Sequence, residues 1–186
     1  MLDLNAHGRL FHFSDDPRIR IFSPRPSHRT LKPAVWAIHE PYEYQYLFPR
    51  GCPRVTYCAN ALSDRADIEV HLSGGEAPAV VAFEAGWLER MLSARLYRYE
   101  LPPETFIPQD TYEGSVTARA LVSYEAVTPV GVESMENLLG RLGRLGVEAR
   151  MVPSLWNLRD RILASSLPFS FIRMGNAQPR EEVERA

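Results

Sequence analysis

The stretch Leu10-Phe11-His12-Phe13-Ser14 determines where the fold of this chain begins. Its apolar residues around a central histidine are typical of a strand, in which successive side chains point to opposite faces of a sheet. On such a strand His12 shares a face with Leu10 and Ser14, and the two phenylalanines fill the other face. The sequence therefore predicts a first strand over residues 9–13, with a histidine close to the loop that follows.

The segment 14–33 is predicted to be a long, ordered loop. It contains four prolines, which interrupt regular structure. The apolar residues Ile19, Ile21 and Phe22 within it favour order. Loops of this length inside a compact domain are usually functional or disordered. The loop also carries several arginines: Arg18, Arg20, Arg25 and Arg29.

The rest of the chain is predicted to alternate short strands with a few helices. Further strands are expected at residues 34–38, 55–59, 68–72, 79–83, 96–101, 119–124, 147–152 and 169–174. Helices are expected at residues 41–48, 84–95, 133–145 and 155–164. The clearest of them, 133–145, has Ser134 as its cap and ends at Gly146.

This pattern predicts the α+β class: mixed, mostly antiparallel sheets of short strands with about three helices. Residues 1–176 are expected to form a single globular domain, followed by a polar C-terminal tail over residues 177–186. No G-x-G-x-x-G sequence follows a strand and no Walker A loop is present, so neither of these nucleotide-binding motifs is predicted.

The composition indicates an ordinary globular domain with little net charge. Of the 186 residues, 45% are hydrophobic and 24% charged, and the formal net charge is -2. Binding to long nucleic acid requires a basic surface and is not expected, although a local basic pocket is compatible with this charge. No apolar run reaches the roughly 18 residues of a spanning helix, and no secretory signal is recognisable. A cytoplasmic protein without a membrane partner is expected, and its oligomeric state is left open.

Two cysteines, Cys52 and Cys58, are expected to be free thiols. A disulfide between them is the alternative, but a reducing cytosol favours the thiols. A zinc site needs about four ligands, and no second Cys/His pair at ligand spacing accompanies the two cysteines, so no metal site is predicted.

His12 and Ser14 are the first candidate site residues. One interpretation of His12 is a half-buried ring bonded to a backbone carbonyl. The other is an imidazole that donates a hydrogen bond to a ribose hydroxyl or a phosphate of a ligand, with Ser14 as a second polar contact. The adjacent Asp15 and Asp16 disfavour direct phosphate contact, although they can simply cap a turn.

A second motif, FPRGCPR over residues 48–54, places two arginines directly after prolines. Pro49 and Pro53 restrict the chain before Arg50 and Arg54, which lowers the entropic cost of fixing each guanidinium group. Guanidinium groups suit the oxygens of a phosphate. Two alternatives stay open: solvated surface arginines, or arginines that tie loops to the sheet through backbone carbonyls.

Tyr46 and Glu125 complete the candidate set. Tyr46 belongs to an aromatic cluster that either packs in the core or offers a stacking surface to a purine or nicotinamide ring. Glu125 follows a predicted strand. It is either solvent-exposed, or it anchors a ribose hydroxyl and stabilises positive charge as a glycosidic bond breaks.

The segments 10–14, 35–38 and 48–55 resemble a bacterial family of unknown function, the DUF6886-type proteins. The segments 152–156 and 169–173 are similar to it too, so the resemblance covers most of the chain. It implies no particular activity.

More distantly, the chain is similar to ADP-ribosyltransferase-like proteins, which include RNA 2'-phosphotransferases and DarT-like proteins. This resemblance implies their fold, and NAD as the cofactor. His12 matches the NAD-contacting residue of their first strand, Tyr44 or Tyr46 their aromatic helix, and Glu125 their late glutamate. The chain departs from the pattern after this glutamate, where Ala126 is inserted, and in the second element, whose Tyr/Ser triplet is not clean.

Two functional hypotheses follow. The first is a nucleotide-using transferase of the ADP-ribosyltransferase-like type with NAD as its cofactor. The alternative is a non-catalytic module that binds a phosphorylated small molecule through the same arginines and needs no glutamate. For the first, the expected catalytic residues are His12 and Glu125, and the expected cofactor-binding residues are Ser14, Arg25, Tyr46, Arg50 and Arg54.

Overall fold

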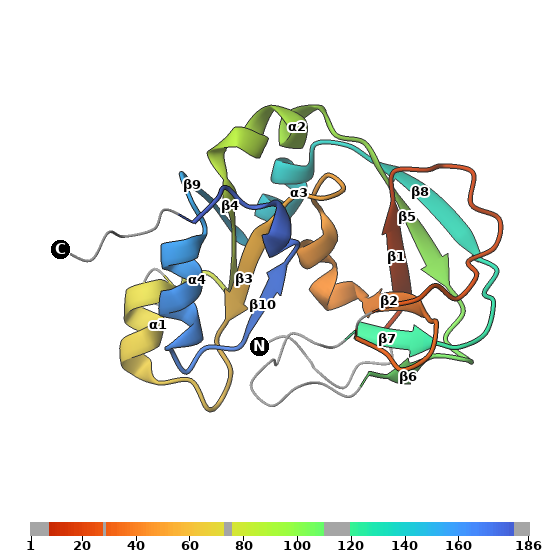
Figure 1. Ribbon diagram of the computed structural model, residues 1–186, viewed down its shortest axis with the longest axis horizontal. Coiled ribbons are helices and arrows are strands. Elements are labelled where there is room, and N and C mark those ends of the chain that lie inside the picture. The colour runs from red at the N-terminus through yellow and green to blue at the C-terminus, as the bar shows by residue number, and fades with distance from the viewer. Residues whose placement is uncertain (1–7, 28, 73–75, 110–119, 181–186) are drawn as a thin grey trace.

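Two β-sheets and the helices around them form this protein, as its computed structural model shows (Figure 1). The structure describes residues 8–27, 29–72, 76–109 and 120–180. All strand pairs but one are antiparallel, so the predicted α+β class is confirmed. No helix in these residues is long and apolar enough to cross a lipid bilayer.

The larger sheet has six strands and contains the histidine-bearing strand near its centre. The strand order is β6-β7-β2-β1-β5-β8, and each neighbouring pair is antiparallel. Its strands are β1 (Leu10–Ser14), β2 (Val35–His39), β5 (Leu96–Leu101), β6 (Ile107–Pro108), β7 (Ala120–Ser123) and β8 (Gly131–Met135).

The smaller sheet has four strands in the order β10-β3-β4-β9, with β4 and β9 parallel. Its strands are β3 (Arg54–Cys58), β4 (Ala79–Glu84), β9 (Glu148–Val152) and β10 (Phe169–Ile172). The helices are η1 (Glu40–Tyr46), α1 (Arg65–His71), η3 (Ala85–Trp87), α2 (Leu88–Ser93), α3 (Leu138–Arg144), α4 (Trp156–Leu163) and η4 (Met174–Asn176).

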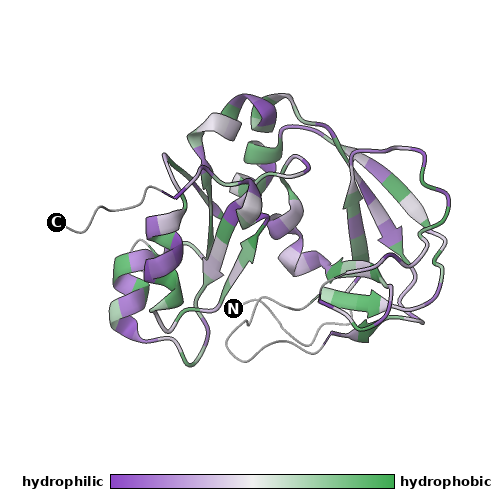
Figure 2. Cartoon of the chain, in the orientation of Figure 1, coloured by the Kyte–Doolittle hydropathy of each residue, from purple (hydrophilic) through white to green (hydrophobic). Residues whose placement is uncertain are grey.

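Three hydrophobic cores hold these layers together. Val81 of β4 packs into the core shared with the larger sheet, whereas its neighbour Val80 packs into a second core with α4. The third core lies on the other face of the larger sheet, where Phe22 of the long loop packs with Leu10 and Tyr99. Figure 2 shows β7 as apolar along most of its length, whereas α1 and α4 carry many hydrophilic residues. The long loop is therefore ordered because it covers a hydrophobic face.

The predicted strand at residues 68–72 is wrong, because this segment belongs to helix α1. The apolar residues Ile68, Val70 and Leu72 alternate as they would in a strand. In the helix, however, Ile68 and Leu72 lie one turn apart and both pack into the core with α4. Val70 is 72% exposed on another side of the helix. Packing therefore overrides the local alternation.

The predicted helix at residues 133–145 begins later than expected. Residues up to Met135 belong to β8, and α3 starts only at Leu138. Asn137, not Ser134, caps the helix: it takes a left-handed conformation with φ of 51°, and its side chain accepts the N–H of Gly140. Gly146 ends the helix with φ of 71°, as predicted.

Both cysteines are free thiols, as predicted. Cys52 precedes β3 and Cys58 is its last residue, so the extended strand separates them. A strand advances about 3.3 Å per residue, which places the two residues much farther apart than a disulfide allows. Burial raises the pKa of the Cys52 thiol to about 12, so this thiol stays protonated at neutral pH.

Candidate functional site

The two central strands of the larger sheet separate beside His12. The ladder between β1 and β2 pairs Leu10 with His39 and Phe11 with Ile38, and these are its two pairs within the described strands. Beyond them, β1 continues against β5 and β2 against β7. Figure 1 shows β1, β5 and β8 turning away from β2, β7 and β6. Backbone groups at this split need partners other than the neighbouring strand.

The imidazole of His12 bridges the split. Its Nδ1 lies 2.8 Å from the backbone oxygen of Trp36 on β2. A carbonyl oxygen only accepts, so Nδ1 carries the proton and Nε2 of the neutral ring is an acceptor. Nε2 has no hydrogen-bond partner within the described part of the chain. Of the two interpretations of His12 from the sequence, the structure shows the half-buried ring bonded to a backbone carbonyl. The N–H donor is therefore already in use, and the free Nε2 offers a lone pair.

The surroundings of His12 keep the ring neutral. The Phe22 ring lies 4.7 Å from the imidazole, and Phe22 in turn packs edge-on against Tyr99 at 5.2 Å. Burial lowers the pKa of His12, the hydrogen bond to the Trp36 oxygen opposes this, and the positive charges of Arg25 and Arg50 lower the pKa further. The ring is therefore uncharged at neutral pH, and Nε2 remains an acceptor.

Arg25 and Arg50 approach His12 from two different loops. Arg25 is anchored through its backbone, which exchanges hydrogen bonds of 3.1 and 2.9 Å with Ala34. Its side chain is exposed, and no carboxylate of the described residues lies within ion-pair distance. The guanidinium group of Arg25 is thus free to bind an anion.

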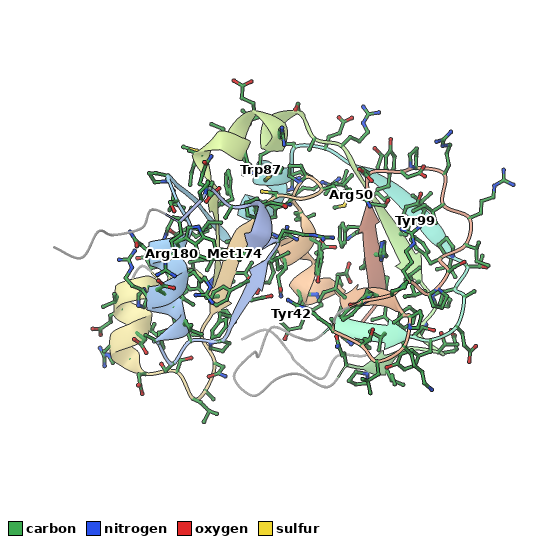
Figure 3. The ribbon with its side chains drawn as sticks, viewed as in Figure 1. Tyr42, Arg50, Trp87, Tyr99, Met174 and Arg180 are labelled. Carbon is green, nitrogen blue, oxygen red and sulfur yellow. The ribbon has the colours of Figure 1, made fainter. Side chains whose placement is uncertain are left out.

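Arg50 lies near the end of β1, as Figure 3 shows. Its Nη1 donates to Oδ1 of Asp15 at 3.0 Å, and its side chain is 70% exposed. A guanidinium group has five N–H donors, so this contact leaves several donors for a ligand. Ser14 faces the same turn: its Oγ accepts the N–H of Asp16 at 3.1 Å, and the hydroxyl proton remains available.

Arg54 and Tyr46 lie elsewhere. Arg54 is 5% exposed, and its guanidinium group donates to the backbone oxygens of Gln45 at 2.5 Å and Cys52 at 2.8 Å. Tyr46 stacks on Phe13, which points to the opposite face of β1 from His12. Arg54 therefore connects η1 to the start of β3. It is an arginine that ties a loop to the sheet through backbone carbonyls, one of the alternatives given above.

Glu125 lies just after β7 in an exposed position. Its backbone N–H bonds to the hydroxyl of Ser123, and no ion-pair partner lies among the described residues. Two residues later, Val127 exchanges two backbone hydrogen bonds with Phe22, the residue whose ring covers His12. The segment that carries Glu125 is thus fixed beside the loop that carries Arg25.

The structure thus brings His12, Arg25 and Arg50 together and leaves Arg54 and Tyr46 apart from them. Sequence reasoning missed two neighbours of this group. Phe22 could have been found as the one aromatic residue of the long loop. The Trp36 oxygen could not, because a backbone acceptor has no sequence signal. Within the described residues, no three His, Cys, Asp or Glu side chains lie together as a metal site would require.

Comparison with known proteins identifies the family. The profile of the "Family of unknown function (DUF6886)" matches residues 11–177. Because this match covers most of the chain, the chain belongs to that family. No curated protein and no solved structure matches it.

The half-buried, neutral His12 makes stability depend on pH. The unfolded chain takes up a proton at this ring as the pH falls through 6.5, whereas the folded chain does so only at lower pH. The stabilisation is therefore complete above that pH and is lost as the pH falls, by at most about 1.4 kcal/mol per pH unit. We predict that His12→Asn flattens the loss of unfolding free energy between pH 7.5 and 5, measured by urea denaturation. His71, whose pKa burial also lowers, is common to both proteins and cancels. Equal losses in both proteins would contradict the assignment.

Arg54 and Arg50 are predicted to respond oppositely to substitution. Arg54→Met leaves two buried carbonyl oxygens unpaired and should lower the unfolding free energy by about 3 kcal/mol. Arg50→Ala removes an exposed ion pair and should change it by less than about 0.5 kcal/mol. Urea denaturation at pH 7.5 measures both. A stable Arg54→Met protein would show that this guanidinium group does not hold the loop.

Proposed function

We propose that this DUF6886 protein binds a small phosphorylated sugar compound, and that a nucleotide such as NAD is its ligand. The observation that carries the proposal is the free acceptor Nε2 of a neutral His12, near enough to the exposed guanidinium groups of Arg25 and Arg50 for their charges to act on the ring. Hydroxyl donors and phosphate oxygens occur together in sugar phosphates and nucleotides. A simple inorganic anion would leave the acceptor nitrogen unused.

The charged and the neutral side chains of the site suit different parts of the ligand. Arg25 and Arg50 suit the phosphate oxygens, because guanidinium groups form charge-assisted hydrogen bonds with them. His12 suits a ribose hydroxyl, which donates to Nε2. Ser14 can add one donor through its hydroxyl proton. Asp15 stays on Arg50 and keeps that side chain oriented toward the site.

The balance of charge favours a small ligand over long nucleic acid. The chain has a formal net charge of -2, and several of its arginines are already engaged with carboxylates or carbonyl oxygens. A long polyanion requires many phosphate contacts over an extended basic surface. Two arginines that converge on one ring match one phosphate or diphosphate group.

A transferase reaction is the second candidate function, favoured by the position of Glu125 and by the resemblance to ADP-ribosyltransferase-like proteins. In this reaction the bond between the nicotinamide nitrogen and C1' of the ribose breaks, and its electron pair leaves with nicotinamide. A nucleophile or water then attacks C1' and loses its proton. Glu125 would stabilise the positive charge that develops on the ribose. Tyr46 lies on the opposite face of β1, so nicotinamide stacking on this residue is not part of the proposal.

Binding is tested by calorimetric titration of the full chain with NAD, AMP and ribose 5-phosphate at 50 mM salt. We predict that Arg25→Ala and Arg50→Ala each weaken binding about tenfold, in the range for one charge-assisted contact. The control is Arg144→Ala, an exposed arginine at the end of α3. The affinity should also fall with added salt. Unchanged affinity in both variants, or an equal effect of Arg144→Ala, would exclude this site.

Catalysis is tested separately by incubating the chain with NAD and quantifying free nicotinamide. If the chain is a transferase or hydrolase, Glu125→Gln should abolish nicotinamide release and preserve NAD affinity, because the amide keeps the shape but lacks the charge. Glu89→Gln, an exposed glutamate on α2, is the control. Binding without nicotinamide release supports the non-catalytic module. Full activity of Glu125→Gln would remove Glu125 from the mechanism.

A further inference from the structure

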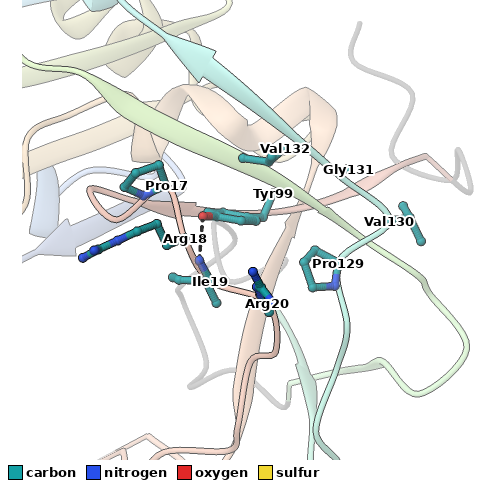
Figure 4. Close-up of a pocket in the computed structure, with 9 residues that line it drawn as sticks. All are labelled: Pro17, Arg18, Ile19, Arg20, Tyr99, Pro129, Val130, Gly131 and Val132. Atoms are coloured by element: carbon teal, nitrogen blue, oxygen red, sulfur yellow. Dashed lines mark hydrogen bonds between the residues drawn. The ribbon is translucent and has the colours of Figure 1, made fainter.

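A pocket of about 400 Å³ opens at the edge of the larger sheet (Figure 4). Residues 17–20 of the long loop form one side, residues 129–132 form the other, and Tyr99 lies between them. Strand pairing places His12, Tyr99 and Val132 side by side on β1, β5 and β8. The pocket therefore lies beyond Tyr99 from His12 and shares no lining residue with the site proposed above.

The wall of this pocket is fixed before any ligand arrives. The hydroxyl of Tyr99 donates to the backbone oxygen of Asp16 at 2.7 Å and accepts the N–H of Ile19 at 3.1 Å. Tyr99 is 1% exposed, so the residue that makes these two hydrogen bonds to the loop is anchored in the core. Pro17 and Pro129 restrict the chain on the two sides. A preformed pocket binds without the entropic cost of ordering its own loops.

The lining of the pocket combines apolar and cationic side chains. Val130 and Val132 are among the lining residues and are 67% and 55% exposed, so they leave apolar surface uncovered there. Arg18 and Arg20 also line the pocket, and no carboxylate side chain is among the lining residues. Arg18 makes one long contact of 3.5 Å with Asp16, and Arg20 has no ion pair among the described residues.

We infer that this pocket binds a small organic anion: a carboxylate or phosphate group on a short apolar chain. The two arginines supply the attraction for the charged group, and the valines supply the surface for the apolar part. An inorganic anion would leave the valines exposed, and a neutral apolar molecule would leave the arginines unused. The volume lies at the lower end of the range for ligand pockets, which limits the guest to a small molecule.

The test uses the full chain, isotope-labelled for NMR and titrated with hexanoate and hexyl phosphate as probes. Saturable shifts of the amide signals of Ile19, Gly131 and Val132 are expected with at least one probe. The tighter of the two identifies the preferred head group, and binding of either supports the inference. Without such shifts from either probe, the inference is overturned.

Variants separate the two parts of the ligand. Arg18→Ala combined with Arg20→Ala should weaken binding about tenfold at low salt, and this difference should shrink in 0.5 M salt, where charges are screened. Val132→Thr should weaken it about fourfold, the loss expected for one methyl group. The control is again Arg144→Ala. Both substituted surfaces are exposed, so the fold should be unaffected.

Three further outcomes would also overturn the inference. Inorganic phosphate could shift the same signals at the same concentration as hexyl phosphate, which would show an adventitious ion only. Hexanol could bind as tightly as hexanoate, which would remove the role of the arginines. The variants could bind like the wild type. Arg25→Ala should leave hexanoate binding unchanged, so failure here and failure of the nucleotide site are distinguishable.

Discussion

The hydrogen bond from the His12 ring to the Trp36 carbonyl oxygen is the contact on which the arrangement of the site depends. The pairing of β1 with β2 stops beside this carbonyl, and a buried carbonyl without a partner costs about 1–3 kcal/mol. A side chain supplies the missing donor, so the two strands can part without leaving that group unsatisfied. The parting lets the long loop fold over the outer face of β1 and brings Arg25 beside the ring. The same bond fixes the proton on Nδ1 and so decides that Nε2 accepts.

Burial decides which of the arginines hold the fold and which are free for a ligand. Arg54 is buried and donates hydrogen bonds to two backbone oxygens. Burial lowers its pKa to about 10. Such a group cannot reach a ligand without breaking the loop that it holds. Arg25 and Arg50 are exposed. The backbone of Arg25 is fixed by its bridge to Ala34, and Arg50 lies in a turn closed by the hydrogen bond from the N–H of Cys52 to the oxygen of Pro49. In the FPRGCPR motif each proline precedes an arginine, but only the first of these arginines, Arg50, faces solvent.

The sequence predicted much of the fold because the apolar pattern matches burial in strands such as β4, a nearly continuous apolar run that is buried throughout, and β5, where Tyr99 and Leu101 alternate with less buried residues. It failed where the pattern and burial conflict: Val70 alternates with Ile68 as in a strand, yet the helix packs Ile68 and turns Val70 to solvent. For the site, the convergence of His12 with Arg25 and Arg50 was expected from residue type. The separation of Arg54 was not, because a carbonyl oxygen nine residues away has no sequence signature. The sequence also does not indicate which nitrogen of the His12 ring carries the proton, because the backbone oxygen of Trp36 determines this.

The long loop carries cationic groups on both sides of one aromatic pair. Phe22 packs between His12 and Tyr99, while Arg25 lies toward His12 and Arg18 and Arg20 lie beside the pocket. The contacts that hold the loop include the Tyr99 hydroxyl, the bridge from Phe22 to Val127, and the bridge from Arg25 to Ala34. Two of these contacts involve only backbone atoms, so the charged side chains of the loop contribute little to holding its path. Substitution of the arginines can therefore alter what the loop binds while its path is kept, whereas a loss at Phe22 would disturb both sides at once.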